Sequence, residues 1–379
     1  MKILFVTNTF ENVLNGPSKF ANYLLDMNEI FDHVEIKILT EDISTNSNLI
    51  DSGHIFRLDL KLNFWTRSWG FAYRMFPYYR ACVHIHRSFE FDIVVFNNAI
   101  TGIWSAFKLN IPVLGMINDD NSLCISRKNF QKTTTWFRHL IFHYLEKLAC
   151  QFEAGIIVNS KYLHDLVQKK YNSENIKLHI LYKGVEVSRK ADFRSLNSDL
   201  PIKILFVKSD YIRGGLFDLV EALGLLTKYK FELQIIGPPY SHKKQILEAN
   251  RFLNINIIFS GPQNPIEVQN SIQVSDLFIV PSRKEALGVA NLEAISNGLT
   301  VISTNAGGIP EVLNFGKNGW MTEPGSPKKL AEIISYVIQH PEEQMQKQKD
   351  GFAFVTTHFS QASVLNNFLK ILDHYKSWK

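Results

Sequence analysis

The sequence contains few cysteines and no long hydrophobic run. A membrane-spanning helix needs about 20 consecutive apolar residues, and no stretch approaches that length. The three cysteines lack metal-site spacing and do not indicate a disulfide framework. The first residues, MKILFVTNTF, predict a short strand and lack the apolar region and cleavage site of a signal peptide. We therefore expect a cytoplasmic protein with reduced thiols.

A strong charge of one sign is also missing. The formal net charge is +5, which is modest for 379 residues, and no nucleic-acid-binding motif is present. Nucleic acid is therefore not an expected partner. Hydrophobic residues make up 45% and charged residues 20%, an ordinary globular composition. The length exceeds what one small core needs and favours two domains.

Strand and helix patterns alternate along the whole chain. Before a polar stretch at 187–200, strands are predicted at 2–7, 34–40, 93–96, 113–117 and 155–158, and after it at 203–207, 231–236, 255–260, 277–280 and 300–304. The polar stretch has little periodicity and is expected to link two domains. The alternation predicts an α/β protein with two doubly wound Rossmann-like domains that face a central cleft.

The segment from Pro281 to Glu311 is the most informative part of the chain. Pro281 ends a buried strand, and helical periodicity begins at Val289. Glu285 therefore lies in the loop, while Glu293, at 293 − 285 = 8 positions later, lies about one turn into the helix. A second unit follows, with a strand at 300–304 and a glycine-containing loop before the next helix.

This layout favours a ligand with phosphates and hydroxyl groups. Ligands of parallel α/β sheets bind beyond the carboxyl ends of the strands. Glycines allow close approach of the backbone, helix N-termini attract anions, and a carboxylate can accept both hydroxyls of a ribose. The segment therefore predicts a site for a nucleotide diphosphate that carries a hydroxyl-rich group. A plainer interpretation is two ordinary βα units with surface glutamates.

The motifs in this segment also resemble a known family. The E-x7-E pattern of Glu285 and Glu293, followed by GGIPE at 307–311 and NGW at 318–320, resembles the retaining family 4 glycosyltransferases of GT-B fold, the glycosyl transferases group 1. The resemblance implies transfer of a sugar from a UDP- or GDP-type nucleotide sugar to a glycan or lipid-linked glycan. It also implies bacterial surface polysaccharide synthesis as the setting, without a metal or another cofactor.

The resemblance implies a division of labour between domains. Residues 1–190 would form the acceptor-binding domain and residues 191–360 the nucleotide-sugar-binding domain. The terminal helix at 361–379 would pack back on the first domain. Within the second domain, Glu293 would hold the ribose and Glu285 would face the donor sugar. The further substrate-binding positions implied are Ala286, Leu287, Gly288, Gly307 and Gly308.

Two cations are expected to grip the diphosphate. The family has an arginine, four residues and then Lys-Gly at this point, whereas this chain exchanges the types to Lys208 and Arg213-Gly214. Either cation can stabilise a leaving diphosphate, so both are expected to be catalytic, together with Glu285. An alternative alignment places Ser209 and Gly214 at these positions, leaves no cation and predicts a weakened or inactive enzyme.

The first domain is expected to contribute three further residues. Family members often carry a Gly-Gly pair near the donor phosphates and acceptor, and only Gly16 remains here, where a plain helix cap explains it equally well. The family's His-Asp pair corresponds to Asn118 and Asp119. Asn118, also expected to be catalytic, can donate to a hydroxyl but cannot titrate. The adjacent acids Asp119 and Asp120 lack further metal ligands and predict a solvated turn.

Residues 57–87 mix bases with aromatic side chains. One interpretation is a basic amphipathic helix in peripheral contact with the inner face of a membrane. The other is a helix packed on the sheet with solvated arginines. A second helix, at 131–152, places His139 and His143 on one face without a third metal ligand, which favours packing.

Two alternatives to a transferase remain open from the sequence. A related GT-B enzyme, such as a sugar-nucleotide epimerase or a phosphorylase, would share the donor site. A catalytically inactive relative that only binds sugar nucleotides would explain Asn118 and the exchanged cations.

Overall fold

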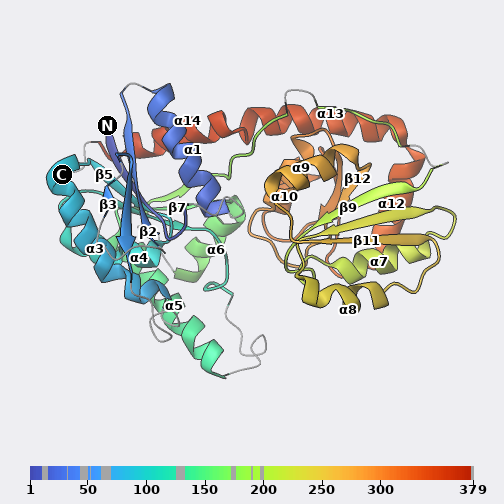
Figure 1. Ribbon diagram of the computed structural model, residues 1–379, viewed down its shortest axis with the longest axis horizontal. Helices are drawn as coiled ribbons and strands as arrows, with labels where there is room; N and C mark the ends of the chain where they lie inside the picture. The colour runs from blue at the N-terminus through green and yellow to red at the C-terminus, as the bar shows by residue number, and fades with distance from the viewer. Residues whose placement is uncertain are drawn as a thin grey trace. The chain divides into compact units, whose positions relative to one another are not determined.

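A computed structural model of the chain describes residues 1–10, 16–31, 33–42, 50–51, 53–60, 70–124, 133–171, 176–188, 191–196 and 200–376. The chain forms two units (Figure 1). Unit 1 comprises Met1–Lys183 and Val364–Lys379, and unit 2 comprises Gly184–Ser363. Among the described residues, no helix has both the length and the apolar character needed to cross a membrane.

Unit 1 is built on an eight-stranded sheet in the order β3-β4-β2-β1-β5-β6-β7-β8. Its strands are β1 (Lys2–Val6), β2 (Glu35–Asp42), β3 (Ile50–Asp51), β4 (Ile55–Asp59), β5 (Ile93–Phe96), β6 (Val113–Ile117), β7 (Gly155–Val158) and β8 (Leu178–Ile180). All neighbours are parallel except β3 and β4. The strand order reverses at β1, which places a ligand-binding switch point at its carboxyl end.

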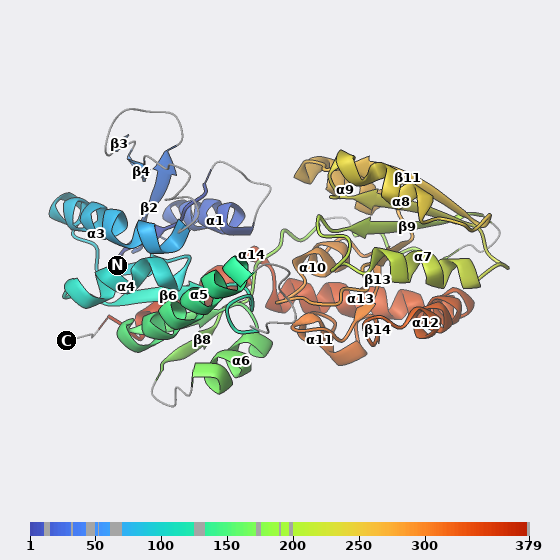
Figure 2. The same cartoon turned by 90° about the horizontal axis from the view of Figure 1, so that it is seen from below.

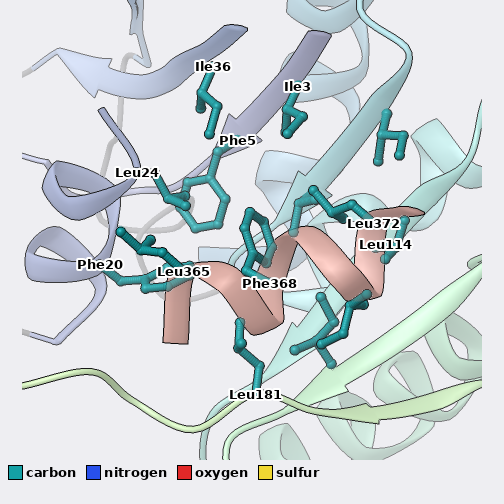
Figure 3. Packing of buried hydrophobic residues seen from close by; sticks show 14 of the residues in the cluster. Ile3, Phe5, Phe20, Leu24, Ile36, Leu114, Leu181, Leu365, Phe368 and Leu372 are labelled. Atoms are coloured by element: carbon teal, nitrogen blue, oxygen red, sulfur yellow. The ribbon is translucent and has the colours of Figure 1, made fainter. Parts of the chain in front are cut away.

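Alternate residues of β1 build two separate cores on the two faces of this sheet. Ile3 and Phe5 face α1 (Gly16–Ile30) and α14 (Gln361–Asp373), whose Phe368 is fully buried (Figure 3). Leu4 and Val6 face α3 (Gly70–Phe89). Among the described residues, the further helices of unit 1 are α4 (Ala99–Lys108), α5 (Thr133–Phe152) and α6 (Lys161–Tyr171). Burial on both faces explains why strands such as β1, β5 and β7 read as continuous apolar runs.

Unit 2 contains a six-stranded sheet, parallel throughout, in the order β11-β10-β9-β12-β13-β14. The strands are β9 (Ile202–Val207), β10 (Phe231–Ile236), β11 (Ile255–Gly261), β12 (Leu277–Ile279), β13 (Thr300–Thr304) and β14 (Trp320–Thr322). The α-helices are α7 (Leu216–Leu225), α8 (Lys243–Glu248), α9 (Pro265–Val274), α10 (Val289–Ile295), α11 (Ile309–Val312), α12 (Pro327–Gln339) and α13 (Pro341–His358). The order reverses at β9, between β10 and β12.

The predicted α/β class and doubly wound topology are confirmed, but the helix expected over 57–87 is partly wrong. Arg57 lies in strand β4, and helix α3 begins at Gly70. The sequence Phe56-Arg57-Leu58-Asp59 alternates in polarity, which suits pairing with β2 in the sheet. Residues 61–69 of this segment lie outside the described part of the chain.

The polar stretch predicted as a linker packs on unit 2. Ser188 donates its backbone N–H to the carbonyl of Ser296 at 3.1 Å. The carbonyl of Arg194 accepts from the side chains of Gln344 and Gln348 at 2.9 and 3.2 Å. The division between units accordingly falls between Lys183 and Gly184.

Candidate active site

Lys208 and Glu285 meet at the carboxyl edge of the unit 2 sheet. Lys208 follows β9, Glu285 lies in the loop after β12, and their side chains form an ion pair. The side chains are only 25% and 20% exposed. Gly214 makes room for the lysine, because a Cβ atom there would lie 3.0 Å from Lys208 Cγ. The first predicted cation is therefore in direct contact with the glutamate that was predicted to face the donor sugar.

The second predicted cation lies in a more open position. Arg213 forms an ion pair with Asp210 at 3.3 Å, and both side chains are at least half exposed. The turn that carries them ends at Gly215, which has a positive φ of 74°. A Cβ atom on Gly215 would lie 2.2 Å from the carbonyl oxygen of Pro281, so the loops after β9 and β12 touch.

A third cation, Arg283, also joins the loops after β9 and β12. The sequence analysis did not predict it as a site residue. Its guanidinium donates two hydrogen bonds to Asp218 of α7, at 2.9 and 2.7 Å. This bidentate pair raises the pKa of Arg283. Its backbone N–H donates to the carbonyl of Arg213 at 2.7 Å. The sequence signal that could have identified Arg283 was a base two positions after Pro281. Its acidic partner, Asp218, is distant in sequence.

The two glycine-containing loops of unit 2 are in contact. Gly308 lies against the loop after β12, because a Cβ atom there would lie 2.4 Å from the carbonyl oxygen of Ala286 and 3.0 Å from Leu287 Cα. A Cβ atom on Gly288 would lie 3.6 Å from Glu285 Cγ. Gly307 and Gly288 both have positive φ, at 56° and 96°. Gly288 combines its positive φ with close packing, because a Cβ atom there would lie 2.8 Å from Asn291 Nδ2, and this combination favours glycine.

The predicted spacing of the glutamates is confirmed at the level of secondary structure. Glu285 precedes α10, and Glu293 lies inside that helix, as the pattern required. The β12 and β13 ends are fixed to each other, since Thr304 Oγ1 donates to the carbonyl of Ser282 at 2.5 Å and Ser303 Oγ to that of Val280 at 2.7 Å. The roles of the glutamates in substrate binding stay predictions.

In unit 1, three asparagines follow three neighbouring strands. Asn97, Asn118 and Asn159 come directly after β5, β6 and β7. Asn118 Nδ2 donates to the carbonyl and side-chain oxygens of Asn97 at 2.8 and 3.3 Å. Asn159 Nδ2 donates to the carbonyl of Asn118 at 2.9 Å. The amide donor expected for a sugar hydroxyl is thus bound to Asn97 in this structure.

The acidic pair after Asn118 divides into one exposed and one buried residue. Asp119 accepts from the backbone N–H of Asn121 at 2.9 Å. Asp120 is 4% exposed and accepts from Tyr162 OH at 3.0 Å, so the expectation of a solvated turn is wrong for this residue. Within the described ranges, no group of three or more acids, histidines or cysteines could hold a metal ion.

A buried glutamate on α5 binds the loop that follows β6. Glu146 accepts hydrogen bonds from Ser122 Oγ at 2.6 Å and Tyr171 OH at 2.7 Å. Burial raises the pKa of Glu146 to about 7. His143 Nδ1 lies 2.8 Å from the carbonyl of Ser122, in agreement with a packing role for that histidine. An acid inside an aromatic-rich helix was the available sequence signal.

The remaining predicted residue of unit 1 is Gly16, the first residue of α1. A residue not predicted, Lys183, has its ammonium 5.4 Å from the ring centre of Phe20 on the same helix. Burial lowers the pKa of Lys183 to about 8. Gly16, Asn118 and Asp119 thus belong to unit 1, whereas the cations, the glutamates and the other glycines of the predicted site belong to unit 2.

Comparison with known proteins gives two family matches that together span most of the chain. Residues 36–189 match the family described as Glycosyltransferase Family 4, and residues 188–352 match Glycosyl transferases group 1. The first match covers most of unit 1 before its terminal helix, and the second covers most of unit 2.

Individual relatives are distant in sequence. An uncharacterized 41.2 kDa protein in the cps region of Klebsiella pneumoniae is 24% identical over 98% of this chain and 99% of its own length. The lipopolysaccharide 1,2-N-acetylglucosaminetransferase of Salmonella typhimurium is 26% identical over 43% of this chain and 45% of its own length. The structure of Anabaena Alr3699/HepE with UDP-glucose aligns at a TM-score of 0.68 with 18% identity, covering 99% of this chain and 100% of that one.

Proposed function

The chain belongs to the family 4 glycosyltransferases of GT-B fold, and from this premise we propose that it retains anomeric configuration during sugar transfer. The proposed donor is a UDP or GDP sugar, and the proposed acceptor is a glycan or lipid-linked glycan of a bacterial surface polysaccharide. The observation that carries the donor site is the meeting of Lys208 and Glu285 at the switch point of unit 2. Relatives named for a cps region and for lipopolysaccharide support the setting.

The proposed chemistry follows from the charges that develop. The bond between the anomeric carbon and the diphosphate oxygen breaks, and its electron pair leaves with the phosphate. Lys208, Arg213 and the backbone N–H groups of Gly307 and Gly308 would stabilise that negative charge. Glu293 would bind the ribose of the donor. No metal ion is required for this set of interactions.

The acceptor hydroxyl completes the balance of atoms. Its oxygen bonds to the anomeric carbon, and its proton passes to the departing phosphate. Glu285 would face the donor sugar and orient it, while its partner Lys208 remains close to the phosphates. The acceptor is assigned to unit 1. Gly16 would lie near the donor phosphates and the acceptor, and Asp119 would bind substrate. Asn118 would take the catalytic place of the family's histidine, which faces the donor sugar. Peripheral membrane contact within residues 57–87 would give access to a lipid-linked acceptor.

A panel of nucleotide sugars tests the proposal. Thermal melting of the protein should rise with UDP or GDP sugars and less with ADP sugars, because a ligand that binds only the folded state stabilises it. The product made with the bound donor should keep the anomeric configuration of that donor by NMR. An inverted product would reject the retaining mechanism, and no shift with any donor would reject the donor site. Release of an epimerised sugar nucleotide without acceptor would identify an epimerase instead.

A further inference from the structure

Large hydrophobic side chains are exposed together on three helices of unit 1. The helices α3, α4 and α5 lie side by side (Figure 2). Among the described residues of unit 1, eight of the nine exposed large hydrophobic side chains lie on them; the ninth is Ile30. The eight are Tyr73, Phe76, Trp104, Phe107, Phe137, Leu140, Tyr144 and Phe152, hereafter the aromatic face.

Ring contacts join the three helices across this face. The ring centres of Phe76 on α3 and Trp104 on α4 are 6.4 Å apart. Those of Phe107 on α4 and Phe152 at the end of α5 are 6.0 Å apart. Exposed rings that contact one another across neighbouring helices form a patch, and patches of this kind mark binding surfaces.

The opposite sides of these helices already have partners. Tyr78, Cys82 and Ile85 of α3 are buried against the sheet, as are Ala99 and Ile100 of α4 within unit 1. The exposed rings are therefore additional to what the fold of unit 1 requires. A packed helix with only solvated arginines on its outer side, the plainer sequence interpretation, does not account for them.

The exposed charges on the three helices of the aromatic face are basic. The helices α3, α4 and α5 carry the bases Arg74, Arg80, Arg87, Lys108, Arg138 and Lys147. Their one acid, Glu146, is only 7% exposed. Arg74 is bound to Glu41, but Arg80 lies 5.9 Å from the Phe76 ring centre and Lys108 lies 5.0 Å from that of Phe107. Cations thus stand beside the exposed rings.

We propose that the aromatic face binds the surface of an anionic lipid bilayer. Aromatic side chains settle at the boundary between headgroups and acyl chains, and neighbouring lysines and arginines are attracted to anionic headgroups. A soluble acidic protein, as the alternative partner, could pair with the basic side chains. Such a partner would not explain the large exposed area of aromatic rings. Of the 57–87 segment that the sequence suggested for membrane contact, the aromatic face includes only the part in α3. The rest of the aromatic face lies on α4 and α5.

Vesicle sedimentation without any sugar substrate tests this surface. The wild-type chain should sediment with phosphatidylcholine vesicles that contain phosphatidylglycerol, and the bound fraction should fall as salt is added. The variant Arg80→Glu/Lys108→Glu/Arg138→Glu should bind about 100-fold more weakly, because each base near an anionic surface contributes strongly to binding. The charge-matched control is Lys230→Glu/Lys243→Glu/Arg251→Glu, at exposed positions of unit 2, and should bind like the wild type.

A second variant separates ring insertion from charge. Phe76→Ser/Phe107→Ser/Phe137→Ser should bind at least about tenfold more weakly, since interfacial affinity scales with buried apolar area. Its control, Leu253→Ser/Ile266→Ser/Val274→Ser, removes exposed apolar side chains of unit 2. Unchanged thermal melting of each variant shows that it is folded.

Three results would overturn the proposal. They are no sedimentation at low salt, equal loss in the face variants and their controls, and a wild-type dimer that the face variants dissociate. The proposal deepens the membrane contact named under the proposed function, but the readouts are separate. Slow hydrolysis of a sugar nucleotide in solution reports on the transferase site even when vesicles do not bind.

Discussion

Charged side chains from separate βα units meet at the edge of the unit 2 sheet. Lys208 and Glu285 pair directly, and Arg283 ties the same loops to Asp218. The exchange of lysine and arginine relative to the family pattern therefore leaves a cation at the first position. Under the proposed function, the diphosphate and its sugar would be held at this edge.

Kinetics of single variants distinguish the roles of two of these residues. Lys208→Ala should lower kcat by about 10²–10³, because it removes a cation from the developing negative charge. Glu293→Ala should raise the KM for the donor roughly tenfold with a smaller change in kcat, since a ribose contact acts in ground and transition states alike. Steady-state transfer assays measure both.

Matched exposed residues serve as controls. Lys203→Ala on β9 and Glu221→Ala on α7 should leave both constants unchanged. Arg213→Ala should lower kcat in the same direction as Lys208→Ala. Wild-type kinetics in all three site variants would reject this assignment of the site.

Buried Glu146 gives unit 1 a pH-dependent stability. Its folded pKa of about 7 lies above its ordinary value of 4.5. Between these values the folded state binds the proton and the unfolded state releases it, so the free energy of unfolding falls as pH rises through this window. Glu146→Gln should abolish this loss of stability. The loss amounts to about 3 kcal/mol, because each unit of pKa shift corresponds to ~1.4 kcal/mol.

Denaturant unfolding of Glu146→Gln and wild type, at about pH 5 and about pH 8, measures this effect. The variant should gain stability over the wild type mainly at the higher pH. Glu221→Gln, at an exposed position, should show no such dependence. An equal difference at both pH values would contradict the assigned titration.

At the scale of elements, the loops after β12 and β13 are in close contact at the proposed donor site. Gly308 has an ordinary φ of −86°, so its need for glycine comes from the nearby carbonyl of Ala286 and Cα of Leu287. Gly308→Ala should destabilise unit 2 by about 1–3 kcal/mol and weaken donor binding, because the two loops must move apart. Thermal shift with the bound donor measures both effects.

Gly325→Ala provides the contrast. Gly325 has a positive φ of 69°, and no heavy atom lies within 4 Å of the position that a Cβ atom would take, so alanine there introduces backbone strain without a clash. It should lower stability yet preserve donor affinity. Loss of donor affinity in both variants would mean that stability, rather than loop contact, controls binding.

The elements themselves were largely predictable. Buried strands such as β1, β5 and β12 appear as apolar runs, because both faces of a parallel sheet are covered. The short strands β3 and β14 lie at sheet edges and have weak patterns of their own. Strand β4 was absorbed into a predicted helix, since its few residues adjoin a long aromatic segment.

At the scale of the whole molecule, the C-terminal helix α14 packs against the N-terminal strand β1. Phe368 and Leu372 of α14 pack with Ile3 and Phe5 in one core of unit 1 (Figure 3). Phe368→Ala should lower the free energy of unfolding of unit 1 by about 3–5 kcal/mol, through lost burial and a cavity. Unit 2, which contains none of these residues, should keep its stability.

Hydrogen exchange followed by mass spectrometry resolves the two units. Protection should fall in the strands of unit 1 and stay unchanged in those of unit 2. Asn367→Ala, exposed on the same helix, is the control and should alter neither unit. Equal loss of protection in both units would show that they unfold together.

The sequence by itself determined the α/β class, the strand–loop–helix order around Glu285 and Glu293, and the family, because local periodicity and motif spacing are properties of neighbouring residues. Tertiary structure decided which side chains contact one another. Lys208 reaches Glu285 across 285 − 208 = 77 positions, and Asn97, Asn118 and Asn159 align only because β5, β6 and β7 are adjacent. The aromatic face likewise arises where three separate helices pack side by side, since strand and helix order in space is set by global packing rather than by sequence distance.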